Sequence, residues 1–151
     1  MKRLIVGLLA LGLLSWAGVS YGAGSCSQRY FDLDNTGIMR AEFTCTADAA
    51  AATWPAITTQ WQIVGLVFAA ETNPGATAPT DNYDITVVNS NGIDIFGGAL
   101  ANRDTSTSER TMPILNSLYG AVPSDGQLTI NITNNAVNSA IVVLTLYWFS
   151  G

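Results

Sequence analysis

The carboxylates that could do chemistry in this chain gather in residues 82–104, NYDITVVNSNGIDIFGGALANRD. Asp84 and Asp94 flank an Asn-Gly pair, so an antiparallel hairpin could set one carboxylate opposite the other. Glycoside hydrolysis uses two carboxyl groups about 5–9 Å apart in a cleft with aromatic walls. Both acids alternate with apolar residues, which favours solvated side chains beside a turn, or an Asp84 that bonds to backbone at the start of a loop. We therefore expect no catalytic residue here.

The same stretch fails the two calcium-loop patterns that it partly matches. With Gly92 as the invariant glycine of an EF-hand loop, Val87 and Gly98 occupy the first and last ligand positions, and neither has a side-chain oxygen. A calcium β-roll needs stacked repeats of about nine residues, and residues 92–98 hold one incomplete copy. The chain has no His, the usual ligand of zinc and iron. We expect no metal and no other cofactor.

The composition is poor in charge. Charged residues make up 11% of the 151 residues, against about 25% in an average soluble domain, and the net charge is -5. No cluster of Lys and Arg marks a nucleic-acid site, so we expect no nucleic-acid partner. Beyond residues 1–24 there is no Lys, and four Arg against eleven acids give a net charge of -7. This part of the chain therefore cannot form a lysine Schiff base or a P-loop.

The first residues, 1–24, predict a targeting segment. Two cations, Lys2 and Arg3, precede an apolar run over 4–19 and then small residues, which is typical of a secretory signal peptide cut after Ala23 or Gly24. The alternative is an uncleaved hydrophobic helix that anchors the chain in a membrane, although the run is shorter than the about 20 residues of a stable span. Either way the chain is expected to be exported, with one domain over residues 25–151.

Cys26 and Cys45 are the two cysteines of the chain. In an exported protein they predict one disulfide. It would close a loop of about 20 residues and stabilise the fold by about 3 kcal/mol. The alternatives are two free thiols, or a lipidated Cys26 in a sequence that loosely resembles a lipoprotein cleavage box.

The hydrophobic pattern predicts an all-β protein. In residues 38–46 the alternation points Met39, Ala41, Phe43 and Cys45 inward. Turn signals separate about seven strands, and we expect an antiparallel β-sandwich or a jelly-roll-like barrel. The expected strands are 28–34, 38–46, 60–70, 83–89, 93–96, 127–134 and 139–149. Between them we expect a polar loop over 100–112, a short helical turn over 113–119 and a turn over 122–126.

Three short sites within this pattern have specific expectations. Asn91-Gly92 predicts a hairpin turn with positive φ at both residues. Gly65 predicts a bulge or a close approach of backbone in its strand. Asn102-Arg103-Asp104 predicts either a local Arg–carboxylate contact or a contact that fixes a neighbouring subunit.

The runs TDNYDITV (80–87), NGID (91–94), GGA (97–99) and ANRD (101–104) together resemble a small family of phage and prophage proteins, mostly uncharacterised and encoded among virion structural genes. The resemblance implies a virion-associated structural role, with copies of itself or other virion proteins as partners. It also makes the stretch 82–104 a structural hairpin, in which Gly97 and Gly98 relieve crowding. The exported leader departs from the family pattern.

We therefore expect a non-enzymatic structural protein that self-associates, a phage-related virion or decoration component. The alternative is an exported carbohydrate- or surface-binding β-sandwich module that uses exposed aromatic rings. Its candidates are Trp54, Trp61, Tyr119 and Trp148, although Trp61 and Trp148 lie in apolar segments that favour packing. The expected location is the periplasm, the outer surface or the medium, or the virion if the resemblance holds.

Overall fold

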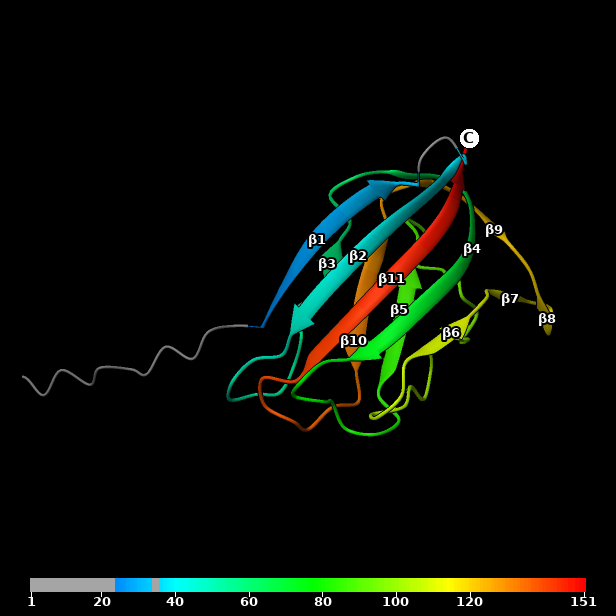
Figure 1. The fold of residues 1–151 in the computed structure, drawn as a ribbon. Coiled ribbons are helices and arrows are strands. Elements are labelled where there is room, and N and C mark those ends of the chain that lie inside the picture. Colours follow the sequence, from blue (N-terminus) through cyan, green and yellow to red (C-terminus); the bar gives the residue numbers. More distant parts are fainter. Residues whose placement is uncertain (1–23, 34–35) are drawn as a thin grey trace, which may run out of the picture.

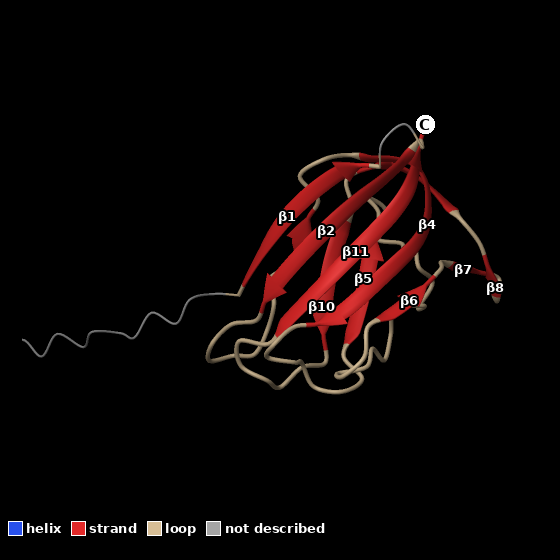
Figure 2. Ribbon diagram, viewed as in Figure 1, coloured by secondary structure: helices blue, strands red, loops and turns tan. Residues whose placement is uncertain are grey.

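The computed structural model describes residues 24–33 and 36–151, in which every regular element is a β-strand (Figures 1 and 2). All strand pairs are antiparallel, which confirms the predicted class. These residues form eleven strands instead of about seven, and the expected N-terminal hydrophobic helix falls outside them. The strands are β1 (Ser25–Asp32), β2 (Ile38–Thr46), β3 (Ile57–Thr58), β4 (Ile63–Pro74), β5 (Asp84–Val88), β6 (Glu109–Thr111), β7 (Ile114–Leu115), β8 (Leu118–Tyr119), β9 (Val122–Gly126), β10 (Thr129–Thr133) and β11 (Ile141–Ser150).

Two sheets face each other across one apolar core. The larger sheet has the order β1-β2-β11-β4-β6, and β9 pairs with another part of β4. The smaller sheet, β3-β10-β5, lies behind it in Figure 1. The inward faces follow the predicted alternation: Phe43, Leu144 and Leu146 of the large sheet and Val87 and Ile130 of the small one are fully buried. The fold is therefore β-sandwich-like, and truncating one of these larger side chains to Ala should cost about 2–5 kcal/mol.

The strand β4 is irregular at two points. Trp148 pairs with Val67 and Tyr147 pairs with Ala69, so Phe68 is an extra residue that bulges from the ladder with β11. Gly65 has φ of +130°, and a Cβ there would lie 1.8 Å from the carbonyl oxygen of Phe149. The predicted close approach at Gly65 is confirmed, because only glycine leaves room for the neighbouring backbone.

A disulfide joins the edge strand β1 to β2, as predicted. Cys26 lies directly opposite Cys45, and the two are bonded. The N–H of Leu33 donates to the carbonyl of Ile38, so the alternation of the ladder makes Cys26 and Cys45 a non-hydrogen-bonded pair. Cα atoms approach most closely at such pairs, and here they are 4.0 Å apart. The bond indicates folding in an oxidising, exported environment.

Several predicted elements differ in the structure. The expected strand 93–96 reduces to one bridge, between Val88 and Asp94. The expected turn 122–126 is the strand β9, because it pairs with the first half of β4. The expected helical turn 113–119 is instead the hairpin β7–β8, and the expected loop 100–112 ends in β6. The strands β6, β7 and β8 have two or three residues, too short for alternation to reveal them. The sequence of β9, VPSDG, has the Pro, Asp and Gly that are typical of a turn.

Candidate functional site

The two acids of the opening stretch bind backbone rather than each other. The carboxylate of Asp94 accepts hydrogen bonds from the N–H groups of Val87, Phe96 and Gly98, over 3.2, 3.1 and 2.8 Å. The carboxylate of Asp84 accepts one from the N–H of Asn102, over 2.8 Å. Both acids therefore hold loop backbone against β5. Backbone bonding was one of the two roles expected for Asp84, and the structure adds it for Asp94.

Their separation does not suit paired-carboxylate chemistry. Asp94 bridges to Val88, at the other end of β5 from Asp84. Val88 is four residues after Asp84 along β5, and a strand rises about 14 Å over that length. Asp84 itself lies opposite Thr133 of β10. The geometry of glycoside hydrolysis is absent at this pair, and the lack of any enzymatic activity stays a prediction.

The Asn91-Gly92 turn forms with a different geometry from the one predicted. The N–H of Asn89 donates to Ile93 and the N–H of Gly92 donates to Asn89. Gly92 has φ of +76°, whereas Asn91 does not have a positive φ. The expected positive φ at both residues is therefore wrong. The Asn89 side chain explains the change, because its Oδ1 accepts the N–H groups of Asn91 and Ile93 and stabilises a longer turn that ends in one left-handed glycine.

Gly97 is the point where this stretch touches the next one. Its φ is +58°, and a Cβ there would lie 2.3 Å from the carbonyl oxygen of Ile114. The N–H of Ile114 donates to the carbonyl of Phe96 over 3.1 Å. Gly98 also has positive φ, +81°, but a Cβ there would meet open space. Gly97 thus relieves steric crowding, as predicted, and leaves room for the backbone of Ile114, the first residue of β7.

The segment Asn102-Arg103-Asp104 makes contacts within the chain. Arg103 donates from Nε and Nη2 to the carbonyl of Ala101, and its Nη1 lies 3.6 Å from Oε1 of Glu109. Only 13% of its side chain is exposed. The Asp104 carboxylate accepts the N–H groups of Ser106 and Thr107, and these hydrogen bonds lower its pKa to about 2. The local contact forms, while a contact with another subunit stays a prediction.

The backbone of Arg103 also pairs with Tyr83, a residue that is completely buried. Burial raises the pKa of Tyr83 to about 12. Its phenol therefore stays neutral at physiological pH, as the core around it requires.

Residues 112–121 form an arm that leaves the sheet edge after β6 and returns at β9. In Figure 1 its strands β7 and β8 lie away from the two sheets. Asn116 and Ser117 both have positive φ, 48° and 66°, which makes a two-residue hairpin turn of the primed kind. The N–H of Gly120 closes the hairpin on the carbonyl of Pro113. Two apolar pairs around the polar pair Asn-Ser were the sequence signal for this hairpin.

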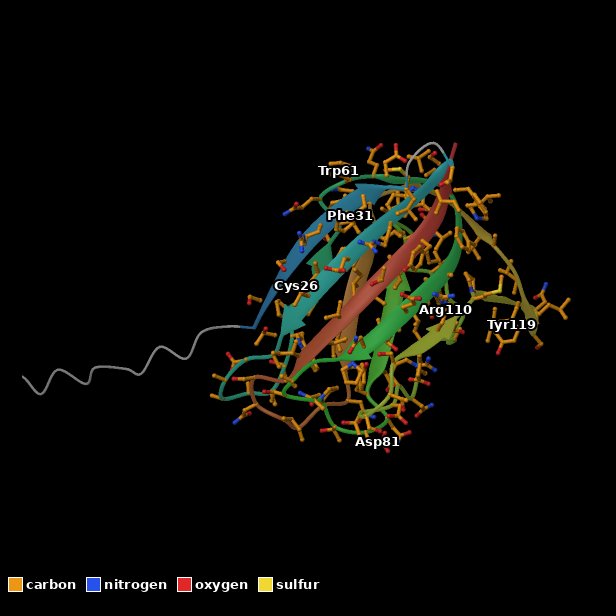
Figure 3. The ribbon with its side chains drawn as sticks, in the orientation of Figure 1. Cys26, Phe31, Trp61, Asp81, Arg110 and Tyr119 are labelled. Atoms are coloured by element: carbon orange, nitrogen blue, oxygen red, sulfur yellow. A yellow bond between two sulfur atoms is a disulfide. The ribbon has the colours of Figure 1, made fainter. Side chains whose placement is uncertain are left out.

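The arm exposes large apolar side chains. Leu118 is 72% exposed and Tyr119 69%, followed by Leu115 and Met112. Figure 3 shows Tyr119 at the outer end of the arm. In a chain with so few charges, apolar groups on a projecting hairpin are the clearest candidate for a contact surface.

The aromatic residues expected to bind a surface do not form a row. Trp54 and Trp148 are buried, which confirms packing for Trp148. Trp61 is 54% exposed and stacks on Tyr30 with 4.6 Å between ring centroids. Its expected packing in the core is therefore wrong, while packing at an interface stays a prediction. Trp61 precedes β4 instead of lying within it. Figure 3 shows Trp61 and Tyr119 at distant places on the molecule.

Residues 24–33 and 36–151 hold no group of three Asp, Glu, Cys or His side chains that could bind a metal ion. In the same residues no helix is long and apolar enough to cross a membrane. Comparison of the chain with family models, curated proteins and solved structures finds no match.

Proposed function

We propose that this protein is a non-enzymatic structural component that self-associates through its arm, as a phage-related virion or decoration protein would. The observation that carries the proposal is the exposure of Leu118 and Tyr119 on a hairpin that stands off the core. Burying an apolar side chain of this size contributes about 1.5–3 kcal/mol, so a few such contacts per subunit can support assembly.

The root of the arm supports the same role. The carbonyl of Phe96 accepts the N–H of Ile114, the first residue of β7, and Gly97 lies close to the carbonyl of Ile114. Asp94 in turn holds the backbone of Phe96 and Gly98. A contact surface needs such a fixed base, because an arm ordered only on binding would lose conformational entropy at that step. The stretch that resembles the phage family is thus the one that positions the arm.

The test is the oligomeric state of the full chain, measured by light scattering and sedimentation over a wide range of concentrations. We expect the wild type to exceed the mass of a monomer and the double variant Leu118→Ser/Tyr119→Ser to remain monomeric. The matched control is Ile93→Ser, which removes an apolar side chain of 60% exposure at the Asn-Gly turn. It should assemble like the wild type.

A wild type that is monomeric at every concentration would contradict self-association. A double variant that still assembles would contradict the role of the arm in assembly. Virion membership has its own test. Particles banded from a lysate of the source cells should contain the chain in stoichiometric amounts by mass spectrometry. Its absence from such particles would leave self-association standing and remove the virion role.

A further inference from the structure

The outward face of the large sheet carries a row of charged side chains, unusual for this charge-poor chain. Arg29 and Glu42 lie opposite each other on β1 and β2, and Glu71 and Arg110 on β4 and β6. The neutral Thr145 of β11 lies in register between Glu42 and Glu71. Figure 3 looks onto this face and shows Arg110 beside β6, at the far side of the sheet from β1. The row extends across the whole sheet, although nothing in the core requires these charges.

A hollow of about 540 Å³ lies in this face, over β2, β11 and β4, with β6 and Ser108 on one side. Its volume is within the range of about 300–1,000 Å³ that small-ligand sites occupy. Tyr147 and neutral polar residues such as Asn73 and Thr145 line the hollow together with charged side chains. The hollow therefore offers hydrogen-bonding groups around an aromatic ring.

Some charged groups of the hollow already have partners. The Nε of Arg110 donates to Oε1 of Glu71 over 2.7 Å, and the phenol of Tyr147 donates to Oε2 over 2.9 Å. Burial opposes ionisation of Glu71, but these two hydrogen bonds outweigh it and hold its pKa below the usual value. Glu109 likewise pairs with Arg103.

Arg40 and Glu42 have no such partners among the described residues. The guanidinium of Arg40 lies 4.1 Å from the centroid of the Phe31 ring, which holds it in place, and its Nε is buried without a hydrogen bond. The two side chains point to the same face of β2, two residues apart, which is about 7 Å along the strand. A fixed donor and an acceptor thus stand side by side in the hollow with free hydrogen-bonding capacity.

We propose that this hollow binds a neutral saccharide, with Arg40 donating to one hydroxyl oxygen and Glu42 accepting from a neighbouring hydroxyl. A guanidinium only donates and a carboxylate only accepts, whereas each hydroxyl of a vicinal diol can do both. The charges favour a neutral ligand, because Arg110 pairs with Glu71 and Arg103, outside the hollow, pairs with Glu109. One guanidinium and one carboxylate, those of Arg40 and Glu42, are then left in the hollow and balance each other. Tyr147 supplies apolar area for the sugar ring.

This site goes beyond the proposed structural role and does not depend on it. The hollow is open, so a single site should bind weakly, with a dissociation constant on the order of 1 mM. If the protein also assembles, many weak sites on one particle would bind a glycan-coated surface with avidity.

The test is saturation-transfer NMR of the full chain with neutral oligosaccharides built from glucose, galactose, mannose or N-acetylglucosamine, and in parallel with oligosaccharides that contain a uronic acid. We expect transfer to at least one of them, with an affinity then measured by titration. Glu42→Gln and Arg40→Gln should each weaken that affinity about tenfold, as the loss of a charged hydrogen bond does. Arg29→Gln, in the same row but outside the hollow, should leave it unchanged.

Three results would overturn the proposal. One is no transfer to any neutral oligosaccharide. Another is an affinity that Glu42→Gln leaves unchanged, because the proposal requires Glu42 as the acceptor that pairs with the donor Arg40. The third is transfer only to acidic sugars that is lost with Arg40→Gln alone, which would make the site a carboxylate receptor. Thermal unfolding of each variant checks that the fold is intact, and Glu42→Gln decides the matter if Arg40→Gln does not fold.

Discussion

The carboxylate of Asp94 accepts a hydrogen bond of 2.8 Å from the backbone N–H of Gly98. It accepts two more from the N–H groups of Val87 and Phe96. One side chain thereby satisfies three backbone donors at the place where the chain leaves β5 and turns toward the arm. Asp94 therefore has a structural role, which is to hold the loop backbone after β5 in place.

Replacing Asp94 should destabilise the fold more than replacing Asp84. Asp94→Ala leaves three N–H groups without their acceptor, and we expect a loss of about 2 kcal/mol or more in the free energy of unfolding. Asp84→Ala removes one acceptor and should cost about 1 kcal/mol. Urea denaturation of the two variants measures both losses. Equal losses would contradict the bridging role of Asp94.

The two neighbouring glycines should respond differently to the same change. Gly98→Ala places a Cβ in open space at positive φ, and we expect a cost of about 1 kcal/mol. Gly97→Ala adds a clash with the carbonyl of Ile114, so it should cost about 1–3 kcal/mol more. If the arm mediates assembly, Gly97→Ala should also weaken it. Similar melting temperatures for the two variants would show that the backbone at Ile114 shifts to accommodate the added Cβ without loss of stability.

The disulfide should contribute a large part of the stability. The sequence separation of 19 residues predicts that Cys26→Ala/Cys45→Ala lowers the free energy of unfolding by about 3 kcal/mol. Denaturation without reductant provides the measurement, and wild type treated with reductant is the control. The intact protein should also weigh less than its reduced form by two hydrogens. A double variant as stable as the wild type would mean that backbone pairing with β2 holds β1 in place without the disulfide.

The loop after Arg103 should weaken in acid. Hydrogen bonds from Ser106 and Thr107 lower the pKa of Asp104 from 3.8 to about 2, so the ionised form is favoured in the folded state. Its contribution is complete above pH 3.8 and is lost as the pH falls through 2. The stability difference between wild type and Asp104→Asn should therefore shrink over that window. A difference that does not change with pH would show that Asp104 has the same pKa in both states. NMR titration of the carboxyl group gives the pKa directly.

Much of the sandwich could be predicted from alternation alone. The inward residues of β2, β5 and β10, such as Phe43, Val87 and Ile130, follow from a period of two that is visible in any extended chain. The pairing of Cys26 with Cys45 followed from there being two cysteines in a chain expected to be exported. The roles of Asp84 and Asp94 as turn-side acids were also predictable, though not which N–H groups they bind.

The candidate sites were less predictable, because they depend on residues far apart in the chain. Trp61 lies in an apolar segment, yet Tyr30 covers one face of its ring and leaves more than half of the side chain exposed. The short strands β6 and β9 exist because β4 offers them an edge. Neither sequence has a pattern strong enough to predict a strand by itself.

The sequence by itself determined the all-β class, the faces of the longer strands, the disulfide and the turn at Asn91-Gly92, because these depend on neighbours in the chain or on a single pair of like residues. Tertiary structure decided where the arm projects and which charges meet. Glu71 and Arg110 are 39 residues apart and touch only because β6 pairs with the edge of β4. Strand register, which no local pattern encodes, brings them together.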